Sequence, residues 1–197
     1  AFGPLTRDIV QALGDGQVTA ANADLLGRTV TGILLGFGPT VLGNLRTVLY
    51  RWVSDRSLWD LQAALRDADG PAPHGYMLAN ATLRQPLVDA LLARPTPEVV
   101  WRTAREDHTL QGVEIREGDR LIVGIASATQ ADLAAGVRDI YTVFGGSRTP
   151  GDWAGDAAPL HACPGYSMGM GVMLGLFGAL LDAGTLRATS SPNTLVL

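Results

Sequence analysis

One long helical stretch constrains this chain more than any other feature. From Thr19 to about Asp55 the sequence favours helix with little interruption. At about 1.5 Å of rise per residue, such a segment spans roughly 50 Å, which is the width of a whole domain. A helix of this length is expected to cross a core, and the other elements are expected to pack around it.

The middle of this stretch reads G-F-G-P-T, from Gly36 to Thr40. The two glycines remove side-chain bulk, and Pro39 removes a backbone hydrogen bond, so the helix is predicted to kink or open here. An opening would leave space beside Thr40 for a bulky group. The alternative is a crossing of two helices at small residues.

The same stretch contains the longest candidate for a membrane span, Val30 to Leu49. Polar residues and helix breakers interrupt it at Gly32, Gly36, Gly38, Pro39, Gly43, Asn44 and Arg46. This pattern favours a buried helix of a soluble protein over a helix that faces lipid.

Composition narrows the class of protein. The chain has 197 residues, of which 47% are hydrophobic, and this is enough apolar material for one sizeable core. We therefore predict a single domain over residues 1–197. With 15 basic and 19 acidic residues, the chain offers no basic stripe for a phosphate backbone, so we expect no nucleic-acid partner.

Cysteine usage and the two ends of the chain bear on location. One cysteine cannot form an internal disulfide, and neither end carries an export signal, so a cytoplasmic location is expected. The chain starts with Ala-Phe-Gly, and the natural N-terminus is therefore not assumed to be present.

The rest of the chain adds short helices and a small sheet. Further helices are predicted over Leu5–Gly16, Ser57–Leu65, Ala79–Ala93 and Ala126–Ala135. From Val99 the periodicity of the sequence changes from helical to strand-like. One strand is predicted from Val99 to Ala104, and two more strands are joined at Arg116–Asp119. The predicted fold class is mainly α with a small β-sheet.

Residues 136–162 are irregular, and a long irregular segment in a compact domain is usually functional. The only cysteine, Cys163, follows this segment and precedes an apolar run to Asp182 that is predicted to be a buried helix. A thiolate is easily stabilised at the start of a helix, where unpaired N–H groups point toward it. Cys163 is therefore a candidate nucleophile or metal ligand, and the alternative is a buried structural cysteine.

The order of these elements resembles the C-terminal half of a cytochrome P-450, a haem-thiolate protein, from about Ala20 to Leu197. In that family a histidine or arginine lies two residues before the cysteine and a glycine two residues after it. His161-Ala162-Cys163-Pro164-Gly165 matches this pattern. The family also has an arginine, here Arg102, followed by an acidic turn and a G-x-x-I-x-x-G-D hairpin.

The resemblance implies a haem cofactor and a role for each matching residue. Cys163 would be the axial ligand of the haem iron, with Gly165 beside the haem. Arg102 and His161 would bind the haem propionates, because their N–H groups suit carboxylates. On the opposite side of the haem, Thr40 would be the catalytic residue and Gly36 would contact the cofactor.

Two departures from the family pattern bear on activity. The family has a Glu and an Arg one helical turn apart, but this chain has Asp89 with a leucine at position 92 and an arginine only at Arg94. Arg148 is a candidate to complete this ion pair. The family also favours an acid before the threonine, where this chain has Pro39, so proton delivery is altered.

Three hypotheses follow. The first is a haem-thiolate oxidoreductase of the monooxygenase type that acts on an apolar organic substrate and receives electrons from a partner. The second is a hydroperoxide isomerase or peroxygenase that acts on a fatty-acid hydroperoxide. The third is a non-catalytic haem-binding or interaction module. Because the family fold needs about twice this length, we expect a missing N-terminal domain or a second copy to cover the haem pocket.

Overall fold

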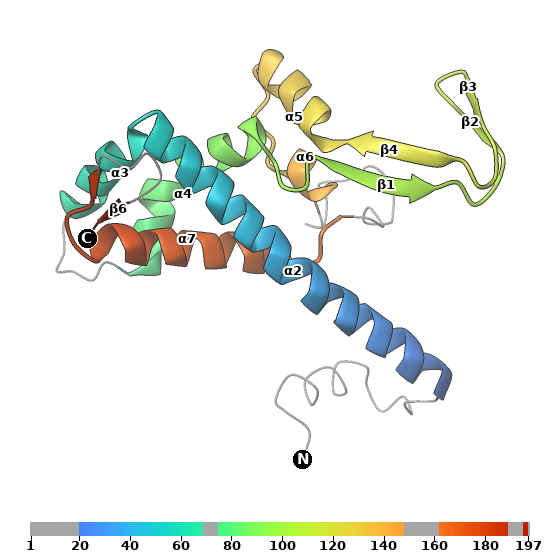
Figure 1. Ribbon diagram of the computed structural model, residues 1–197, viewed down its shortest axis with the longest axis horizontal. Coiled ribbons are helices and arrows are strands. Elements are labelled where there is room, and N and C mark those ends of the chain that lie inside the picture. The colour runs from blue at the N-terminus through green and yellow to red at the C-terminus, as the bar shows by residue number, and fades with distance from the viewer. Residues whose placement is uncertain (1–19, 69–74, 148–161, 189–194, 197) are drawn as a thin grey trace. The chain divides into compact units, whose positions relative to one another are not determined.

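The computed structural model describes residues 20–68, 75–147, 162–188 and 195–196 (Figure 1). The predicted helix Leu5–Gly16 lies outside the described residues, as do His161 and Arg148. The chain divides into two units, Ala1–Gly38 and Pro39–Leu197. That residues 1–197 form one haem-binding domain stays a prediction.

The fold class is the predicted one, mainly helical with small antiparallel sheets. The long helix α2 covers Ala20–Ser54. The helices after it are α3 (Ser57–Arg66), α4 (Tyr76–Ala93), α5 (Ile125–Ala134), α6 (Tyr141–Phe144) and α7 (Tyr166–Asp182). The predicted helices over residues 57–65, 79–93, 126–135 and 165–182 are thus confirmed to within a few residues at either end.

Helix α2 keeps its helical backbone through the stretch where an opening was predicted. Pro39 lies inside the helix, and an added Cβ at Gly36 or Gly38 would meet no atom within 4 Å. A proline removes one backbone hydrogen bond, but its fixed φ is compatible with a helical turn. The prediction of an opened backbone at Gly36–Thr40 is therefore wrong.

The expectation that α2 is buried is also wrong. In the most apolar 18-residue window of Val30–Ser54, 12% of the residues are buried, and Leu42 is 68% exposed. Within the unit Pro39–Leu197 only one side of the helix is buried, at Asn44, Val48 and Trp52, which lie four residues apart. Val30–Ser54 is long and apolar enough to cross a membrane, a test that soluble core helices and signal sequences also pass.

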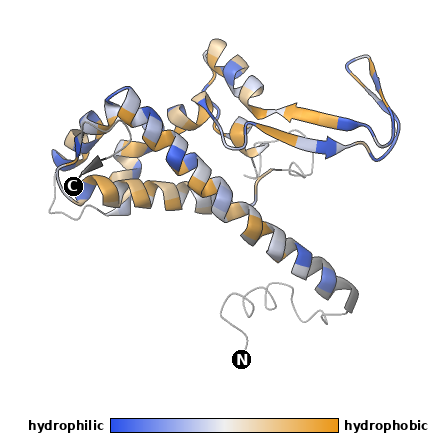
Figure 2. Cartoon of the chain, viewed as in Figure 1, coloured by the Kyte–Doolittle hydropathy of each residue, from blue (hydrophilic) through white to orange (hydrophobic). Residues whose placement is uncertain are grey.

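The core of the second unit lies between α3, α4 and α7. Leu83, Leu87 and Leu91 of α4 are fully buried at the predicted helical spacing, and Val88 beside them is buried too. Trp52 of α2 packs on Phe177 of α7 with ring centroids 4.7 Å apart. Figure 2 shows that α7 is apolar along its length, as expected for a helix that faces a core.

A buried amide fastens α3 to the chain that follows α7. Gln62 is 5% exposed, and its Nε2 donates to the carbonyl oxygens of Leu181 at 2.9 Å and Gly184 at 2.6 Å. Its Oε1 accepts from the Leu186 N–H at 3.1 Å. Both N–H groups and the carbonyl oxygen of this buried side chain are therefore hydrogen-bonded, which offsets the cost of burying it.

Asp55 binds the first residue of helix α3. Ser57 begins the helix, and the Asp55 carboxylate accepts its N–H at 3.0 Å and its hydroxyl at 2.7 Å. Burial raises the pKa of Asp55, but the Ser57 hydrogen bonds and the Arg51 charge outweigh it, so the pKa lies below its usual value. Aspartate is the better acceptor for the free N–H groups of a helix start because it carries a full charge.

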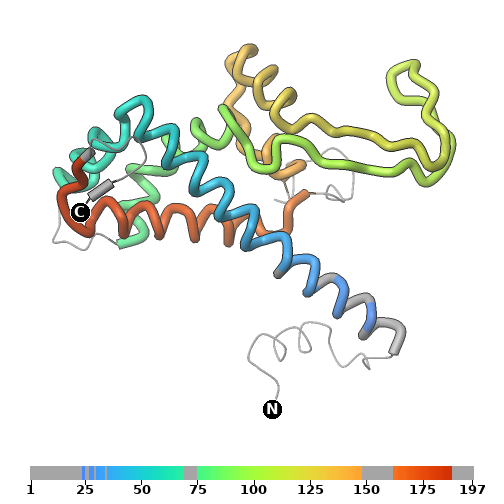
Figure 3. The backbone as a smooth tube through the Cα atoms, in the orientation of Figure 1, coloured from blue at the N-terminus to red at the C-terminus, as the bar shows by residue number. Residues whose placement is uncertain are grey.

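The strands form separate two-stranded sheets. β1 (Val99–Thr103) pairs antiparallel with β4 (Arg120–Gly124), and β2 (His108–Leu110) pairs with β3 (Val113–Ile115). Figure 3 traces the β2–β3 hairpin beyond the β1–β4 pair. The short strands β5 (Arg187–Ala188) and β6 (Leu195–Val196) pair antiparallel with each other.

The predicted hairpin at Arg116–Asp119 is wrong in its pairing. Those residues do form a turn, in which the Arg116 N–H donates to the Asp119 carboxylate at 2.9 Å. The strands on its two sides do not pair with each other, since β4 returns to β1 instead. The tight hairpin lies at Gln111 and Gly112, whose φ values of 51° and 83° suit a two-residue turn between twisted strands.

Candidate functional site

Cys163 lies in a short turn that leads into α7. Its N–H donates to the carbonyl oxygen of Phe144 in α6 at 2.8 Å, and its own carbonyl accepts from the Tyr166 N–H at 3.4 Å. The thiol is free and half-buried. The expectation that the cysteine precedes a helix directly is therefore confirmed.

The start of α7 has no polar side chain of its own to cap it. Gly165 is the N-cap residue, and the first turn contains no acidic residue. The positive end of the helix dipole is therefore not neutralised by a carboxylate of the helix itself. The free N–H groups at this helix start therefore have no partner among the helix's own capping side chains.

An aromatic cluster surrounds the cysteine turn. The Tyr166 ring contacts Tyr141, with centroids 5.1 Å apart, and Phe144, with centroids 4.9 Å apart. Arg84 of α4 donates from Nη2 to the Tyr166 hydroxyl at 2.9 Å. Burial raises the pKa of Tyr166, and the Arg84 charge opposes it, so the phenol is neutral at ordinary pH. Sequence reasoning missed this cluster, although three aromatic residues near the only cysteine were a signal.

The residues predicted for the opposite side of a haem lie on α2. Thr40 is half-buried, and its carbonyl oxygen accepts from Asn44 Nδ2 at 3.0 Å. Gly36 is exposed and lies in the unit Ala1–Gly38. Within the described residues, no hydrogen bond joins Thr40 to Cys163.

Arg102 lies on β1, where its side chain is exposed. Its Nη1 donates to the carbonyl oxygen of Trp101 at 2.8 Å. In the part of the chain that the structure describes, no carboxylate forms an ion pair with Arg102, and no contact joins it to Cys163. Its guanidinium therefore has donors left for an anion, as a propionate-binding role requires. The same role of His161 stays a prediction, because His161 lies outside the described residues.

Asp89 has an ion-pair partner that the sequence did not predict. Asp89 of α4 pairs with Arg138, which lies between α5 and α6, and also accepts from Gln85 at 3.1 Å. Arg94, the nearer candidate, instead pairs with Glu98 at 2.9 Å. The ion pair of Asp89 therefore joins α4 to a residue 49 positions later in the chain.

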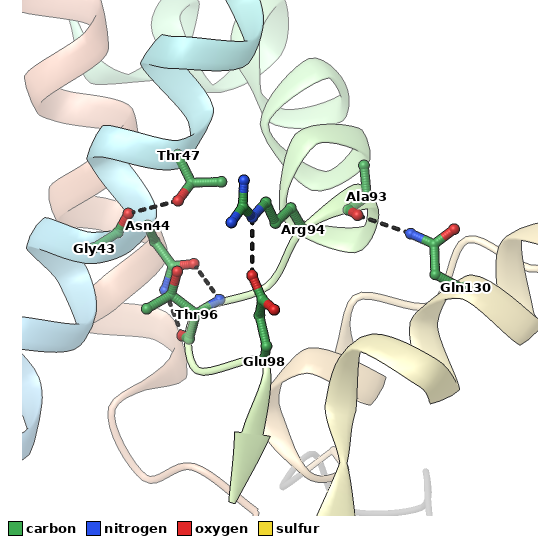
Figure 4. A network of polar contacts seen from close by, with 8 residues as sticks. All are labelled: Gly43, Asn44, Thr47, Ala93, Arg94, Thr96, Glu98 and Gln130. Carbon is green, nitrogen blue, oxygen red and sulfur yellow. Dashed lines mark hydrogen bonds and ion pairs between the residues drawn. The ribbon is translucent and has the colours of Figure 1, made fainter.

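A second polar network fixes α2 to the turn between α4 and β1 (Figure 4). Asn44 is 3% exposed, donates to the Thr96 carbonyl at 2.9 Å and accepts from the Thr96 N–H at 3.0 Å. Beside it, an added Cβ at Gly43 would lie 2.7 Å from Thr96 Cγ2. One turn earlier in the helix, the carbonyl oxygen of Thr40 also accepts from Asn44 Nδ2.

These elements in this order define a fold of the cytochrome P450 haem-domain type. The chain is similar to the cytochrome P450DA heme domain, with a TM-score of 0.59 and 19% sequence identity. It is also similar to CalO2, with a TM-score of 0.54 and 17% identity. At these identities the similarity shows the fold.

The matches cover most of this chain but less than half of the other chains. The first covers 82% of this chain and 38% of the P450DA heme domain, and the second covers 94% of this chain and 46% of CalO2. No protein-family model and no curated protein sequence matches the chain.

Proposed function

We propose that this chain is the part of a haem-thiolate oxidoreductase that supplies the axial ligand of the haem iron. One observation carries the proposal. In a P450-like fold, the only cysteine of the chain lies half-buried at the uncapped start of α7, with its backbone fastened to α6. A sulfur ligand at this position is held by the backbone bonds of the turn that leads into α7.

The residues present fit a haem. Cys163 would supply a soft sulfur donor, and Arg102 has guanidinium donors that no carboxylate among the described residues occupies. We propose that Gly165 lies beside the cofactor and that His161 is a second propionate ligand. When bound, a haem with an axial thiolate supplies electron density that favours cleavage of an O–O bond.

The proposed substrate is an apolar organic molecule, oxygenated with electrons from a partner protein. Thr40 would hold a hydrogen bond to the reacting molecule, and Gly36 would leave room for the cofactor.

One observation favours a peroxide-using alternative. The stretch of α2 from Val30 to Ser54 contains no carboxylate, and Pro39 precedes Thr40. Oxygen activation needs two electrons and two protons, whereas a hydroperoxide is already reduced. A hydroperoxide isomerase or peroxygenase is therefore the second candidate, because it needs no acid on this helix.

A further polypeptide belongs to the proposed site. The outer side of α7 exposes Met168, Val172 and Leu176, at 52%, 37% and 52%, and these residues lie four apart. Exposed apolar stripes of this kind mark surfaces that meet another chain or domain. We propose that an N-terminal domain or a second copy covers it, completing a pocket that this chain builds in part.

The proposal is tested by haem reconstitution and one spectrum. The ferrous carbon monoxide complex of the wild-type chain should show the absorbance typical of an axial thiolate, and Cys163→Ala should lose it. The control is Met77→Ala, which removes an exposed sulfur-containing side chain from α4. A wild-type chain that takes up no haem, or a Cys163→Ala variant with an unchanged spectrum, would sink the proposal.

The same sample separates the two reaction types. Turnover of a fatty-acid hydroperoxide without any reductase supports the peroxide-using alternative. Strict dependence on NAD(P)H and an added reductase supports the monooxygenase. Haem bound in full stoichiometry but inert in both assays points to a non-catalytic haem module.

A further inference from the structure

We propose that Tyr166 is a positioning residue for Cys163, which it holds in place through Phe144, Tyr141 and Arg84. The proposal rests on the haem-thiolate function proposed above and names the residues that keep the thiolate at the start of α7.

Cys163, Phe144 and Tyr166 form a closed ring of contacts. The Cys163 N–H binds the carbonyl of Phe144, the Phe144 ring contacts the Tyr166 ring, and the Tyr166 N–H binds the carbonyl of Cys163. Phe144 therefore contacts both ends of the turn, its backbone at the cysteine and its side chain at the tyrosine. Movement of either end breaks at least one of these contacts.

Contacts of Tyr166 with Arg84 and Tyr141 attach this ring of contacts to the rest of the fold. Arg84 donates to the Tyr166 hydroxyl at 2.9 Å and also to Asn80 Oδ1 at 3.4 Å, so the guanidinium is held by its own helix α4. The Tyr166 ring also contacts the ring of Tyr141 in α6, with centroids 5.1 Å apart. A charged donor makes the stronger kind of hydrogen bond. Tyr166 thus connects α7 to both α4 and α6 at the level of the cysteine.

Packing in the core does not by itself explain why residue 166 carries a hydroxyl group. A phenylalanine would fill the space against Phe144 and Tyr141 equally well, so packing alone does not account for the hydroxyl. The hydroxyl is accounted for by Arg84, which has no carboxylate partner among the described residues. Pro164 and Gly165, between the cysteine and the tyrosine, bring no packed side chain that could replace this anchor.

The consequence is local. Without the anchor, the turn opens more often, and an opened turn exposes the thiol to water and moves it from the helix start. A sulfur ligand then loses its position.

The test reads Cys163 directly in haem-free protein. Because it is the only cysteine, the rate of labelling by an aromatic disulfide reports this thiol alone. We expect Tyr166→Leu to label about tenfold faster than wild type, because local opening becomes more frequent. Tyr166→Phe keeps the aromatic ring but loses the hydrogen bond from Arg84. Its labelling rate should lie between those of the wild type and Tyr166→Leu.

Gly178→Ala is the matched control for general destabilisation. It lies on the same helix, where an added Cβ would approach Ala79 Cβ to 2.8 Å, far from the cysteine turn. Measured where all variants are folded, it should label at about the wild-type rate, since the turn is untouched. The proposal would be overturned if Tyr166→Leu labelled at the wild-type rate, or if Gly178→Ala labelled as fast as Tyr166→Leu.

A spectrum provides the second readout. In the haem-loaded chain, Tyr166→Leu should lower the fraction of the carbon monoxide complex with thiolate-type absorbance, and Tyr166→Phe should keep most of it. An unchanged fraction in Tyr166→Leu counts against the positioning role. If the wild-type chain binds no haem, the proposed function fails, while the labelling experiment still decides whether Tyr166 holds the cysteine turn.

Discussion

Asn44 shows how much one buried side chain can decide in this chain. Its amide makes three hydrogen bonds, to the carbonyls of Thr40 and Thr96 and from the Thr96 N–H. An amide serves here because it donates and accepts at once. Sequence reasoning treated Asn44 only as an interruption of an apolar helix, since a partner 52 residues away leaves no local pattern.

Replacing this amide should cost much of the stability of the fold. Asn44→Ala leaves the buried polar groups of Thr96 without a partner, and we expect a loss of about 2 kcal/mol in the free energy of unfolding. Asn44→Asp should be worse, because a carboxylate cannot donate to two carbonyls. Urea unfolding measures both.

The control for Asn44 lies in the same network. Gln130 makes one exposed hydrogen bond to the carbonyl of Ala93 at 2.8 Å, and Gln130→Ala should change stability by about 0.5 kcal/mol or less. Equal losses in Asn44→Ala and Gln130→Ala would contradict the assigned role of Asn44.

Among the elements, α7 is the one that the sequence predicted most completely. Its apolar run sets both its length and its burial, and Met173, Leu174 and Leu181 are buried as expected. The sheet was predicted less well, because the pairing of β1 with β4 joins segments separated by a hairpin. Local alternation shows where strands lie, but it does not show which strand is the partner.

Two glycines on α7 should respond in opposite ways to alanine. Gly178→Ala places a Cβ 2.8 Å from Ala79 Cβ, so we expect a loss of about 1–3 kcal/mol from overpacking at the crossing with α4. Gly175→Ala meets no atom within 4 Å and should stabilise the helix by up to about 1 kcal/mol. Thermal unfolding of both variants checks the difference in sign, and two changes of the same sign would refute the crossing geometry.

At the scale of the whole molecule, the sequence predicted the fold class and the P450-like order of elements. It missed the contacts that hold the candidate site, namely Arg138 on Asp89 and Arg84 on Tyr166. Arginines on exposed surfaces look alike in a sequence, and only the fold decides which of them finds a partner. The roles of Thr40, Arg102 and Cys163 toward a haem stay predictions.

The exposed side of α7 should make the chain self-associate when no partner is present. The double change Val172→Glu with Leu176→Lys replaces apolar surface by a favourable i,i+4 pair, so the helix is kept while the stripe is lost. Light scattering should show association of the wild-type chain and a monomeric variant.

The matched control for this surface is on α5. Ser127→Glu with Ala131→Lys adds the same charges at the same spacing to exposed positions. This variant should associate like the wild type. A monomeric wild-type chain at high concentration would show that the stripe drives no association.

The amide of Gln62 has a consequence for the order in which the chain folds during synthesis. Its partners lie 119 to 124 residues later, at Leu181, Gly184 and Leu186. At about 5–20 residues per second, a ribosome needs roughly 6–25 s to deliver them after α3 has emerged. During that time α3 and α4 have no α7 to pack against, so their apolar faces are exposed to solvent or bound by a chaperone. The last described helix of this chain is therefore also the one that ends its most aggregation-prone period.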